Sequence, residues 1–206
     1  MSRVSAVLLG AGKSKRMGFD KLSLPWGRKT MLEHCFETLK RSKVHELIVV
    51  LSTRNKGVRD LFQGQKVRTV VNPLSKMGMG TSIRRGLREI HPHCRGILIA
   101  FGDQPLLKTR TINALIRAFD QGQRGIIVPS FRGMKGHPVI FHRKFRRELL
   151  SLRGDVGGRS IIESHPNDVR MVPIKSIGVV KDVDTWRAYH PPTVAMPASG
   201  RRRGKC

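Results

Sequence analysis

The sequence predicts an α/β protein with a mostly parallel central sheet flanked by helices. Uninterrupted apolar runs of four to six residues recur along the chain, and strands buried on both faces of a parallel sheet have this composition. Segments with apolar residues at helical spacing separate these runs, an alternation typical of an α/β layer. The 206 residues are enough for one full core. We therefore expect one domain over residues 1–190 and a basic, disordered tail over 191–206.

The first half of the chain combines apolar runs with turn and capping signals. A short extended piece, Leu22–Trp26, is expected to end in a turn at Gly27. Thr30 can cap the next helix, because its hydroxyl accepts a hydrogen bond from a free amide of the first turn. Asn72-Pro73 closes the third strand. The predicted strands are 4–9, 47–51 and 67–71, and the predicted helices are 30–42, 55–62 and 81–90.

The second half continues the alternation. Ile112, Leu115 and Phe119 recur at helical spacing after a fourth apolar run. Arg143 begins a basic helix, which we interpret as a solvated face, with a docking surface for an acidic partner as the alternative. The predicted strands are 96–101, 126–129, one that ends near 141, and 178–183, and the predicted helices are 109–121 and 143–152.

A basic, glycine-containing loop follows the first strand. It includes Leu9, Gly10, Ala11, Gly12, Ser14, Arg16, Gly18 and Lys21. Small residues let backbone N–H groups approach a phosphate, and the cations neutralise its charge. A P-loop requires a glycine where Val7 stands, and a dinucleotide fingerprint requires one where Lys15 stands. The loop therefore predicts a site for a chain of phosphates, with a solvated basic turn as the alternative.

A second glycine-rich connection, residues 74–82, lies between the third strand and its helix. Gly78, Gly80 and Ser82 stand at the expected start of that helix. Free N–H groups at a helix N-terminus can hold an anion or part of a nucleotide. Capping of the helix alone would also explain a serine or threonine here.

Aspartates follow two of the predicted strands. Asp103 comes after the strand 96–101, and Asp182 and Asp184 lie at the end of the strand predicted over 178–183. Ligands of open α/β sheets bind in the crevice outside the carboxyl ends of the strands. Carboxylates that leave room for water and phosphate suit Mg²⁺. This combination predicts phosphoryl-group chemistry, in which a protein mainly positions reactants and neutralises charge.

The pattern G-x-S-x-R-M-G-x-x-K, from Gly12 to Lys21, resembles the signature of the MobA/MocA-like nucleotidyltransferases of molybdenum cofactor biosynthesis. These enzymes have a GT-A-type fold. Four further phrases match in order, and the resemblance covers about residues 3–185. They are G-M-G-T-S at 78–82, G-D-Q-P at 102–105, G-H-P-V-I-F at 136–141 and G-D-x-G-x-R at 154–159.

The resemblance implies a reaction and a set of residues. MocA-like enzymes transfer CMP from CTP to the phosphate of molybdopterin and release pyrophosphate, whereas MobA-like enzymes transfer GMP. Arg16 and Lys21 would contact the triphosphate, and Asp103 would hold Mg²⁺ together with Asp182 or Asp184. The implied nucleotide contacts are Leu9, Gly10, Ala11, Gly12, Ser14, Arg16, Lys21, Asn72, Gly78, Gly80 and Ser82, and the implied acceptor side comprises Gln104, Pro105, His137, Asp155 and Arg159.

The choice between CTP and GTP depends on one methyl group. Cytidylyltransferases of this family typically read L-A-A-G in the first loop, and guanylyltransferases read L-A-G-G. Ala11 stands at the discriminating position and would crowd the larger purine, which favours CTP. Gly10 departs from the alanine usual in both classes. A second departure is Trp186-Arg187-Ala188, where the family usually has P-E-D, and it leaves open how the last metal ligand is oriented.

Charge and cysteine content bound the remaining function classes. The formal net charge of +26 is typical of nucleic-acid binders, but only four of the 40 basic residues lie in the tail segment 201–205 and the rest are spread along the chain. One tyrosine and two tryptophans offer little surface for stacking bases, so a nucleic-acid-binding protein on a degenerate enzyme fold is the weaker alternative. Three scattered cysteines predict neither disulfides nor a zinc site, and His91-Pro92-His93-Cys94 is interpreted as a loop.

The sequence also predicts where the protein acts and which protein partner it has. The chain shows no apolar run of bilayer length and no signal-peptide pattern, so a cytoplasmic enzyme with no membrane contact is expected. The resemblance implies a molybdenum hydroxylase, or its maturation factor, as the protein partner.

Overall fold

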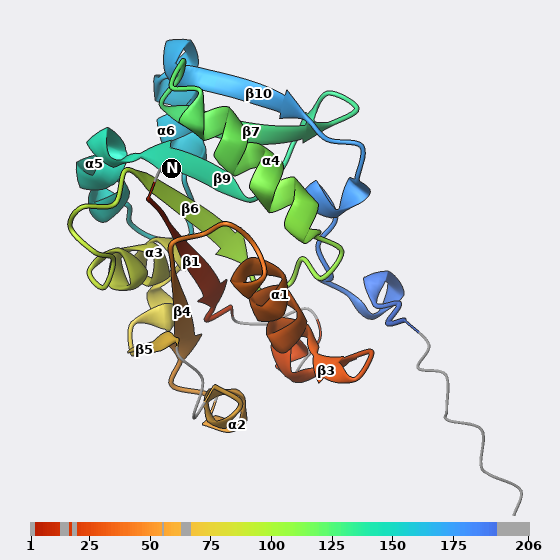
Figure 1. Cartoon of the computed structure of the whole chain (residues 1–206). Coiled ribbons are helices and arrows are strands. Elements are labelled where there is room, and N and C mark those ends of the chain that lie inside the picture. Colours follow the sequence, from red (N-terminus) through yellow and green to blue (C-terminus); the bar gives the residue numbers. More distant parts are fainter. Residues whose placement is uncertain (1–2, 13–16, 18–19, 55, 63–66, 193–206) are drawn as a thin grey trace, which may run out of the picture.

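The computed structural model describes residues 3–12, 17, 20–54, 56–62 and 67–192. A central sheet runs through the molecule, with its strands ordered β10-β7-β9-β6-β1-β4-β5 and a short strand, β8, paired with β7 (Figure 1). The strands are β1 (Val4–Gly10), β4 (Glu46–Ser52), β5 (Arg68–Asn72), β6 (Gly96–Phe101), β7 (Ile126–Phe131), β8 (Met134–Lys135), β9 (Val139–His142) and β10 (Val169–Pro173). The predicted fold class is confirmed, because β1 is parallel to both β4 and β6, whereas β9 is antiparallel to its neighbours.

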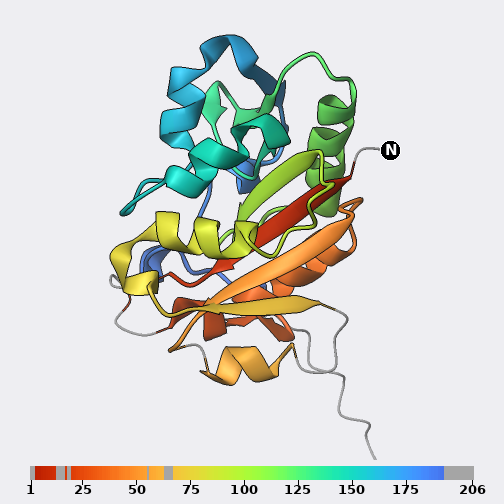
Figure 2. The same cartoon turned by 90° about the vertical axis from the view of Figure 1, so that its left-hand side faces the viewer.

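Helices cover both faces of this sheet (Figures 1 and 2). Successive residues of a strand point to opposite faces, so Leu8 of β1 belongs to a buried cluster with residues of α1 and α4, and Val7 to a second cluster with residues of α3, α5 and α6. The helices are α1 (Met31–Lys40), α2 (Lys56–Asp60), α3 (Met79–Leu87), α4 (Thr109–Asp120), α5 (Arg146–Ser151) and α6 (Arg159–Ser164). Of the helices in the described ranges, none has both the length and the apolar character to cross a membrane.

The predicted start of the first helix is confirmed. The Thr30 hydroxyl accepts from the Glu33 amide, and the Glu33 carboxylate accepts from the Thr30 amide, which together form a capping box. Just before it, a 3-10 turn (Lys21–Ser23) and a hairpin of β2 (Pro25–Trp26) and β3 (Lys29–Thr30) replace the single extended piece that the sequence predicts. The turn of the hairpin includes Gly27, whose φ is +66°.

The C-terminal part differs most from the prediction. The strand predicted over 178–183 is wrong: a 3-10 turn, Ile177–Val179, is followed by irregular chain up to Asp184. Isolated backbone hydrogen bonds hold the segment instead of a strand ladder. The His137 amide donates to the Val179 carbonyl, and the Val183 amide donates to the Asp103 carbonyl. The last strand is β10, at the edge of the sheet beside β7, where a proline such as Pro173 is tolerated.

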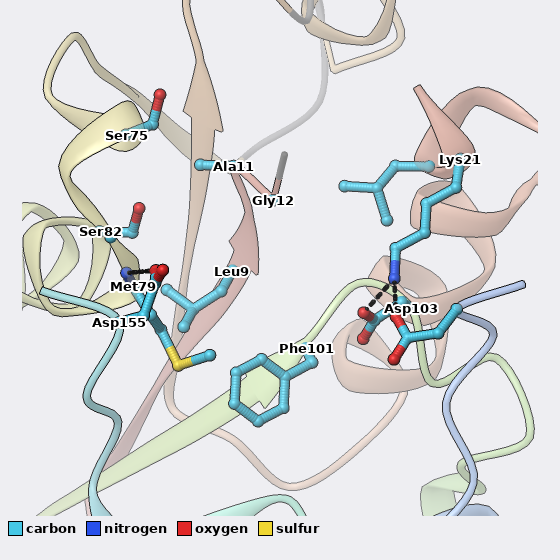
Figure 3. A pocket seen from close by; sticks show the side chains of 13 residues that line it. Leu9, Ala11, Gly12, Lys21, Ser75, Met79, Ser82, Phe101, Asp103 and Asp155 are labelled. Carbon is cyan, nitrogen blue, oxygen red and sulfur yellow. Dashed lines mark hydrogen bonds and ion pairs between the residues drawn. The ribbon is translucent and has the colours of Figure 1, made fainter. Parts of the chain in front are cut away.

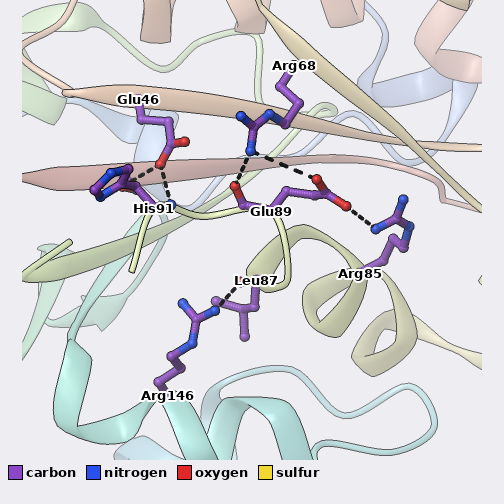
Figure 4. A network of polar contacts seen from close by, with 8 residues as sticks. Glu46, Arg68, Arg85, Leu87, Glu89, His91 and Arg146 are labelled. Carbon is purple, nitrogen blue, oxygen red and sulfur yellow. Dashed lines mark hydrogen bonds and ion pairs between the residues drawn. The ribbon is translucent and has the colours of Figure 1, made fainter. Parts of the chain in front are cut away.

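A polar network links the starts of β4 and β5 to the chain that follows α3 (Figure 4). The Glu46 carboxylate accepts from the Ser5 hydroxyl at 2.9 Å and from the His91 amide at 3.0 Å. Arg68 and Arg85 both contact Glu89. Residues 91–94 form a turn between α3 and β6, as interpreted from the sequence. Within the described ranges, no three histidine, cysteine or acidic side chains could hold one metal ion.

The predicted basic helix is shorter than expected and partly used for structure. A 3-10 turn, Arg143–Phe145, precedes α5, and the Arg146 guanidinium donates to the Leu87 carbonyl at the end of α3 at 2.6 Å. Lys144 lies 2.7 Å from the Asp168 carboxylate. At the other end of the chain, the Tyr189 ring packs against Trp26, and residues 193–206, most of the predicted tail, lie outside the described residues.

Candidate active site

The site lies where the carboxyl ends of β1 and β6 meet. The two strands are parallel neighbours, and the Gly102 amide donates to the Leu9 carbonyl at 3.0 Å, so the loops that follow them begin side by side. Asp103 therefore stands next to the glycine-containing loop 10–12. The amide of Val183 donates to the Asp103 carbonyl at 2.9 Å and brings Asp184 to the same place. This edge of the sheet is where open α/β folds bind ligands.

Lys21 joins the two aspartates (Figure 3). Its Nζ lies 2.6 Å from Asp103 Oδ2 and 2.6 Å from Asp184 Oδ1, and the residue is only 6% exposed. Asp20 fixes the backbone here, because its carboxylate accepts from the Leu22 amide at the start of the 3-10 turn. Burial acts to lower the pKa of Lys21, but the two carboxylates outweigh it and raise the pKa above its ordinary value. The side chain is therefore a charged ammonium.

Asp182 belongs to the same acidic group. Burial first, and then the charges of Asp103 and Asp184, raise the pKa of this carboxyl above its ordinary value. All donors are carboxylate oxygens, which fit a hard divalent cation such as Mg²⁺ or Mn²⁺. The described side chains offer no closed set of three ligands, so an ion here would take its remaining ligands from water and phosphate, as Mg²⁺ commonly does.

A first cavity of about 450 Å³ extends from this cluster to the start of α3 (Figure 3). Its lining comprises Leu9, Ala11, Gly12, Lys21, Leu22, Ser75, Gly78, Met79, Ser82, Phe101, Asp103, Asp155 and Asp184. Among the described residues, no atom lies within 4 Å of where a Cβ at Gly12 would stand. Gly10 does not line the cavity: a Cβ there would lie 3.0 Å from Leu32 and 3.1 Å from Leu51, so close packing explains the glycine. Ser14 and Arg16, predicted to contact the nucleotide, lie outside the described residues.

Asn72, at the end of β5, holds the second glycine-rich loop in place through side-chain hydrogen bonds. The Asn72 amide nitrogen donates to Thr81 Oγ1 and to Ser82 Oγ, both at 2.9 Å, and its oxygen accepts from the Leu74 amide. Asn72 is 2% exposed and does not line the cavity, whereas Ser82 does. The residue thus acts on the site through Ser82 and the shape of the loop.

Asp155 caps the helix that this loop begins. Helix α3 starts at Met79, two residues earlier than predicted, and the Met79 amide donates to Asp155 Oδ1 at 3.2 Å. The Gly80 amide donates to the Gly154 carbonyl at 3.0 Å. The helix N-terminus that the sequence offers to an anion is therefore occupied by this carboxylate. Asp155, predicted on the acceptor side, lines the first cavity.

A second cavity, of about 630 Å³, adjoins the first, because Met79 and Phe101 line both. It contains His137 and Arg159 of the predicted acceptor side, and its walls are largely apolar, with Val139, Phe141 and Ile162 among them. The His137 ring lies edge-on to Phe101 at 4.6 Å, and burial lowers the pKa of His137 below its ordinary value. The buried Nδ1 of His137 has no hydrogen-bond partner among the described residues.

The other acceptor-side residues are placed differently. Gln104 is 3% exposed, and neither it nor Pro105 lines the two cavities. Arg159 pairs with Glu163 at 2.7 Å, whereas Asp155 accepts from the Met79 amide. Sequence reasoning missed Met79 and Phe101, which form the boundary between the cavities. Their positions in the sequence could have indicated this role, since Met79 stands between two loop glycines and Phe101 ends the strand before Asp103.

This fold and site are those of a nucleotidyltransferase, with an open sheet, a small-residue loop beside the carboxylates of Asp103 and Asp184, and two adjoining cavities. Residues 6–169 match the family described as the MobA-like NTP transferase domain. The chain belongs to this family, as its five sequence phrases predict.

Three curated relatives align over most of their length. The chain is 30% identical over 189 residues to nicotine blue oxidoreductase of Paenarthrobacter nicotinovorans, which covers 88% of this chain and 92% of the relative. It is 29% identical over 193 residues to purine catabolism protein PucB of Bacillus subtilis, and the alignment covers 89% of this chain and 92% of PucB. It is 25% identical over 187 residues to molybdenum cofactor cytidylyltransferase of Escherichia coli, and the alignment covers 90% of this chain and 93% of that enzyme. These names differ in activity, so membership of the family does not define the substrate.

Solved structures share this fold. A crystal structure of the Mycobacterium tuberculosis protein Rv0371c superposes with a TM-score of 0.80 at 28% identity, covering 91% of this chain and 95% of the other. A second structure of that protein, described as a complex with manganese, has a TM-score of 0.77 at 26% identity and covers 91% and 96%.

Proposed function

We propose that this protein transfers CMP from CTP to the phosphate of molybdopterin and releases pyrophosphate, with Mg²⁺ as its metal. The observation that carries the proposal is the Lys21, Asp103 and Asp184 cluster beside a cavity that adjoins a second, more apolar one. One cavity has the charges for a metal-bound triphosphate, and the other has the walls for a flat ring system. The similarity to molybdenum cofactor cytidylyltransferase of E. coli supports this choice.

The first cavity would hold the nucleotide. Gly12 leaves room for phosphate beside the backbone, and Lys21, with Arg16, would offset the charge of the triphosphate. Asp103 and Asp184, or Asp182, would bind Mg²⁺, which when bound neutralises charge on the phosphates during transfer. The methyl group of Ala11 borders this cavity and would disfavour a purine.

The second cavity would hold the acceptor. Phe101 and Phe141 offer aromatic surface to a pterin, and Arg159 offers a cation. His137, kept neutral by burial, would be an uncharged polar group in the wall of this cavity. The acceptor phosphate is ionised at neutral pH and attacks the α-phosphorus directly. The reaction therefore needs no general base and no covalent enzyme intermediate.

Two alternatives share parts of this evidence. A nucleotidyltransferase that uses GTP or another phosphorylated acceptor would have the same carboxylates and fold. A nucleic-acid-binding role would use the net charge of +26 and not the cavities. For the main proposal, the site of action is the cytoplasm and the recipient of the product is a molybdenum hydroxylase or its maturation factor.

The decisive experiment measures pyrophosphate release with each of the four NTPs, with and without molybdopterin. We expect release with CTP that depends on molybdopterin and on Mg²⁺. Preference for GTP would support the first alternative. No release with any NTP, together with DNA or RNA affinity that falls steeply with salt, would support the nucleic-acid role.

A further inference from the structure

The Lys21 ammonium lies between two carboxylates, where a metal ion could otherwise bind. Its ammonium lies at 2.6 Å from an oxygen of Asp103 and at 2.6 Å from an oxygen of Asp184. These aspartates belong to a strand-end loop and to the C-terminal segment, 82 and 163 residues away from Lys21. The lysine thus holds together parts of the chain that are remote in sequence, and its single positive charge offsets part of the negative charge of the two carboxylates.

The same carboxylates are the metal ligands in the proposed function. An ammonium and a divalent ion on these oxygens would be a few ångströms apart, and like charges at that separation repel strongly in a partly buried site. The two cations therefore compete. Lysine has a long, flexible stem, so the ammonium can leave while the 3-10 turn, held by Asp20 and by the bond from the Leu24 amide to the Lys21 carbonyl, stays in place.

We propose that Lys21 is a displaceable counter-ion that keeps the metal out of the site until a nucleoside triphosphate draws the ammonium away. The triphosphate offers Lys21 a second set of anionic oxygens inside the cavity that it already lines. Metal and nucleotide binding are then coupled, each favouring the other by the same factor. The metal enters with the substrate and is not stored on the free enzyme. This inference rests on the proposed function, because it takes Asp103 and Asp184 as the carboxylates of the metal.

The proposal makes an unusual prediction about a site lysine: removing it strengthens metal binding. We expect the Kd of Mn²⁺ for the nucleotide-free protein to fall about tenfold or more in Lys21→Met, which keeps an unbranched buried side chain without the charge. Lys21→Arg keeps the charge and should bind as weakly as the wild type. Lys144→Met removes one charge from an ion pair with Asp168 of similar length, 2.7 Å, and should have no effect.

The experiment measures free Mn²⁺ by its electron spin resonance signal, with and without a CTP analogue that has a methylene bridge between the α- and β-phosphorus. The analogue should strengthen Mn²⁺ binding more in the wild type than in Lys21→Met, because only the wild type must release its lysine. Thermal unfolding checks that each variant folds, and Lys21→Gln provides a second uncharged variant.

The outcomes separate this inference from the proposed function. If neither uncharged variant binds Mn²⁺ more tightly, while Asp103→Asn weakens Mn²⁺ binding in the presence of the analogue, Lys21 does not compete and only the inference fails. If Asp103→Asn leaves Mn²⁺ binding unchanged in the presence of the analogue, the carboxylates do not hold the metal, and both proposals fail. Tighter binding in both uncharged variants, with a smaller effect of the analogue, supports the inference.

Discussion

Ala11 is the residue at which the nucleotide preference can be tested with the smallest change. It is 5% exposed and lines the first cavity next to Gly12. We expect Ala11→Gly to raise kcat/KM for GTP relative to CTP, and only partly, because one methyl group typically changes discrimination by ~1–3 kcal/mol. The measurement is the ratio of kcat/KM for the two nucleotides. Ala114→Gly, on the exposed side of α4, is the control for the added glycine.

The outcome decides whether the first loop distinguishes the bases. A ratio that stays the same in Ala11→Gly, or a wild type that already prefers GTP, would mean that this loop does not contact the base. The choice of CTP would then have lost its main support.

Asp103 is the carboxylate with the clearest structural reason for its place. Asp103→Asn keeps the size of the side chain but removes the charge that pairs with Lys21 and would bind the metal. We expect the fold to persist and kcat to fall by about a hundredfold or more, as for loss of a major electrostatic element. Turnover at saturating Mg²⁺ is compared with that of Asp168→Asn, which breaks an ion pair of similar length remote from both cavities. Rates like those of the wild type would remove Asp103 from the mechanism.

At this scale the sequence predicts which residues gather but not which of them pair. The end of β6 and the motif phrases predict Lys21 and Asp103 at one edge of the sheet, where the structure has them. Asp184 also lies there, but it is carried by irregular chain and not by the strand predicted over 178–183. The bonds of Lys21 to both carboxylates, and of Asp155 to the Met79 amide, depend on side-chain distances across loops far apart in sequence. No local pattern encodes such distances. The departure at Gly10 has a packing reason that likewise appears only with Leu32 and Leu51 in place.

At the scale of elements, the loops 75–80 and 153–158 form one interlocked unit. Gly78 has φ of +110°, and a Cβ there would lie 2.2 Å from the Gly154 carbonyl carbon. We expect Gly78→Ala to lower the free energy of unfolding by about 2 kcal/mol or more, since backbone strain and overpacking add. The affinity for CTP should fall as well, because the two loops line the nucleotide cavity.

A matched variant isolates the contribution of the contact. Gly133 also has positive φ, +80°, but a Cβ there would meet no atom within 4 Å, so Gly133→Ala reports the backbone strain alone. Urea unfolding of both variants gives the difference. Equal losses of stability would show that the contact between the loops contributes nothing.

The elements predicted correctly are those with a strong local signal. Helix α1 has a capping box and a regular apolar face, and the central strands are continuous apolar runs. The missed elements, β10 and α6, lie at the edge of the molecule and bury little: β10 is half exposed and contains Arg170 and Pro173. The segment 178–183 was misread as a strand, because the burial of its valines comes from packing against loops. There, Gly178 approaches the Leu106 carbonyl and Val179 is fully buried.

At the scale of the whole molecule, the excess of positive charge makes additional protons costly. Burial lowers the pKa of three histidines below the ordinary value of 6.5, His34, His137 and His142, and neighbouring lysines and arginines lower that of His34 and His142 further. Groups of this kind stay neutral in the folded state but take up protons when the chain unfolds. The net charge of +26 acts in the same direction.

The expected consequence is a fold that loses stability in mild acid. Between pH 6.5 and the lower pKa values of the folded state, the unfolded chain binds more protons, so the free energy of unfolding falls as the pH falls. Each such histidine contributes up to about 1.4 kcal/mol per pH unit in that window. We expect His137→Gln to reduce this slope, measured by urea unfolding at a series of pH values from 7.5 to about 5. The same substitution at exposed His93 controls for the change of side chain. If the slope in His137→Gln equals that of the wild type, His137 does not stay neutral in the fold, and its assignment as an uncharged polar group of the second cavity is wrong.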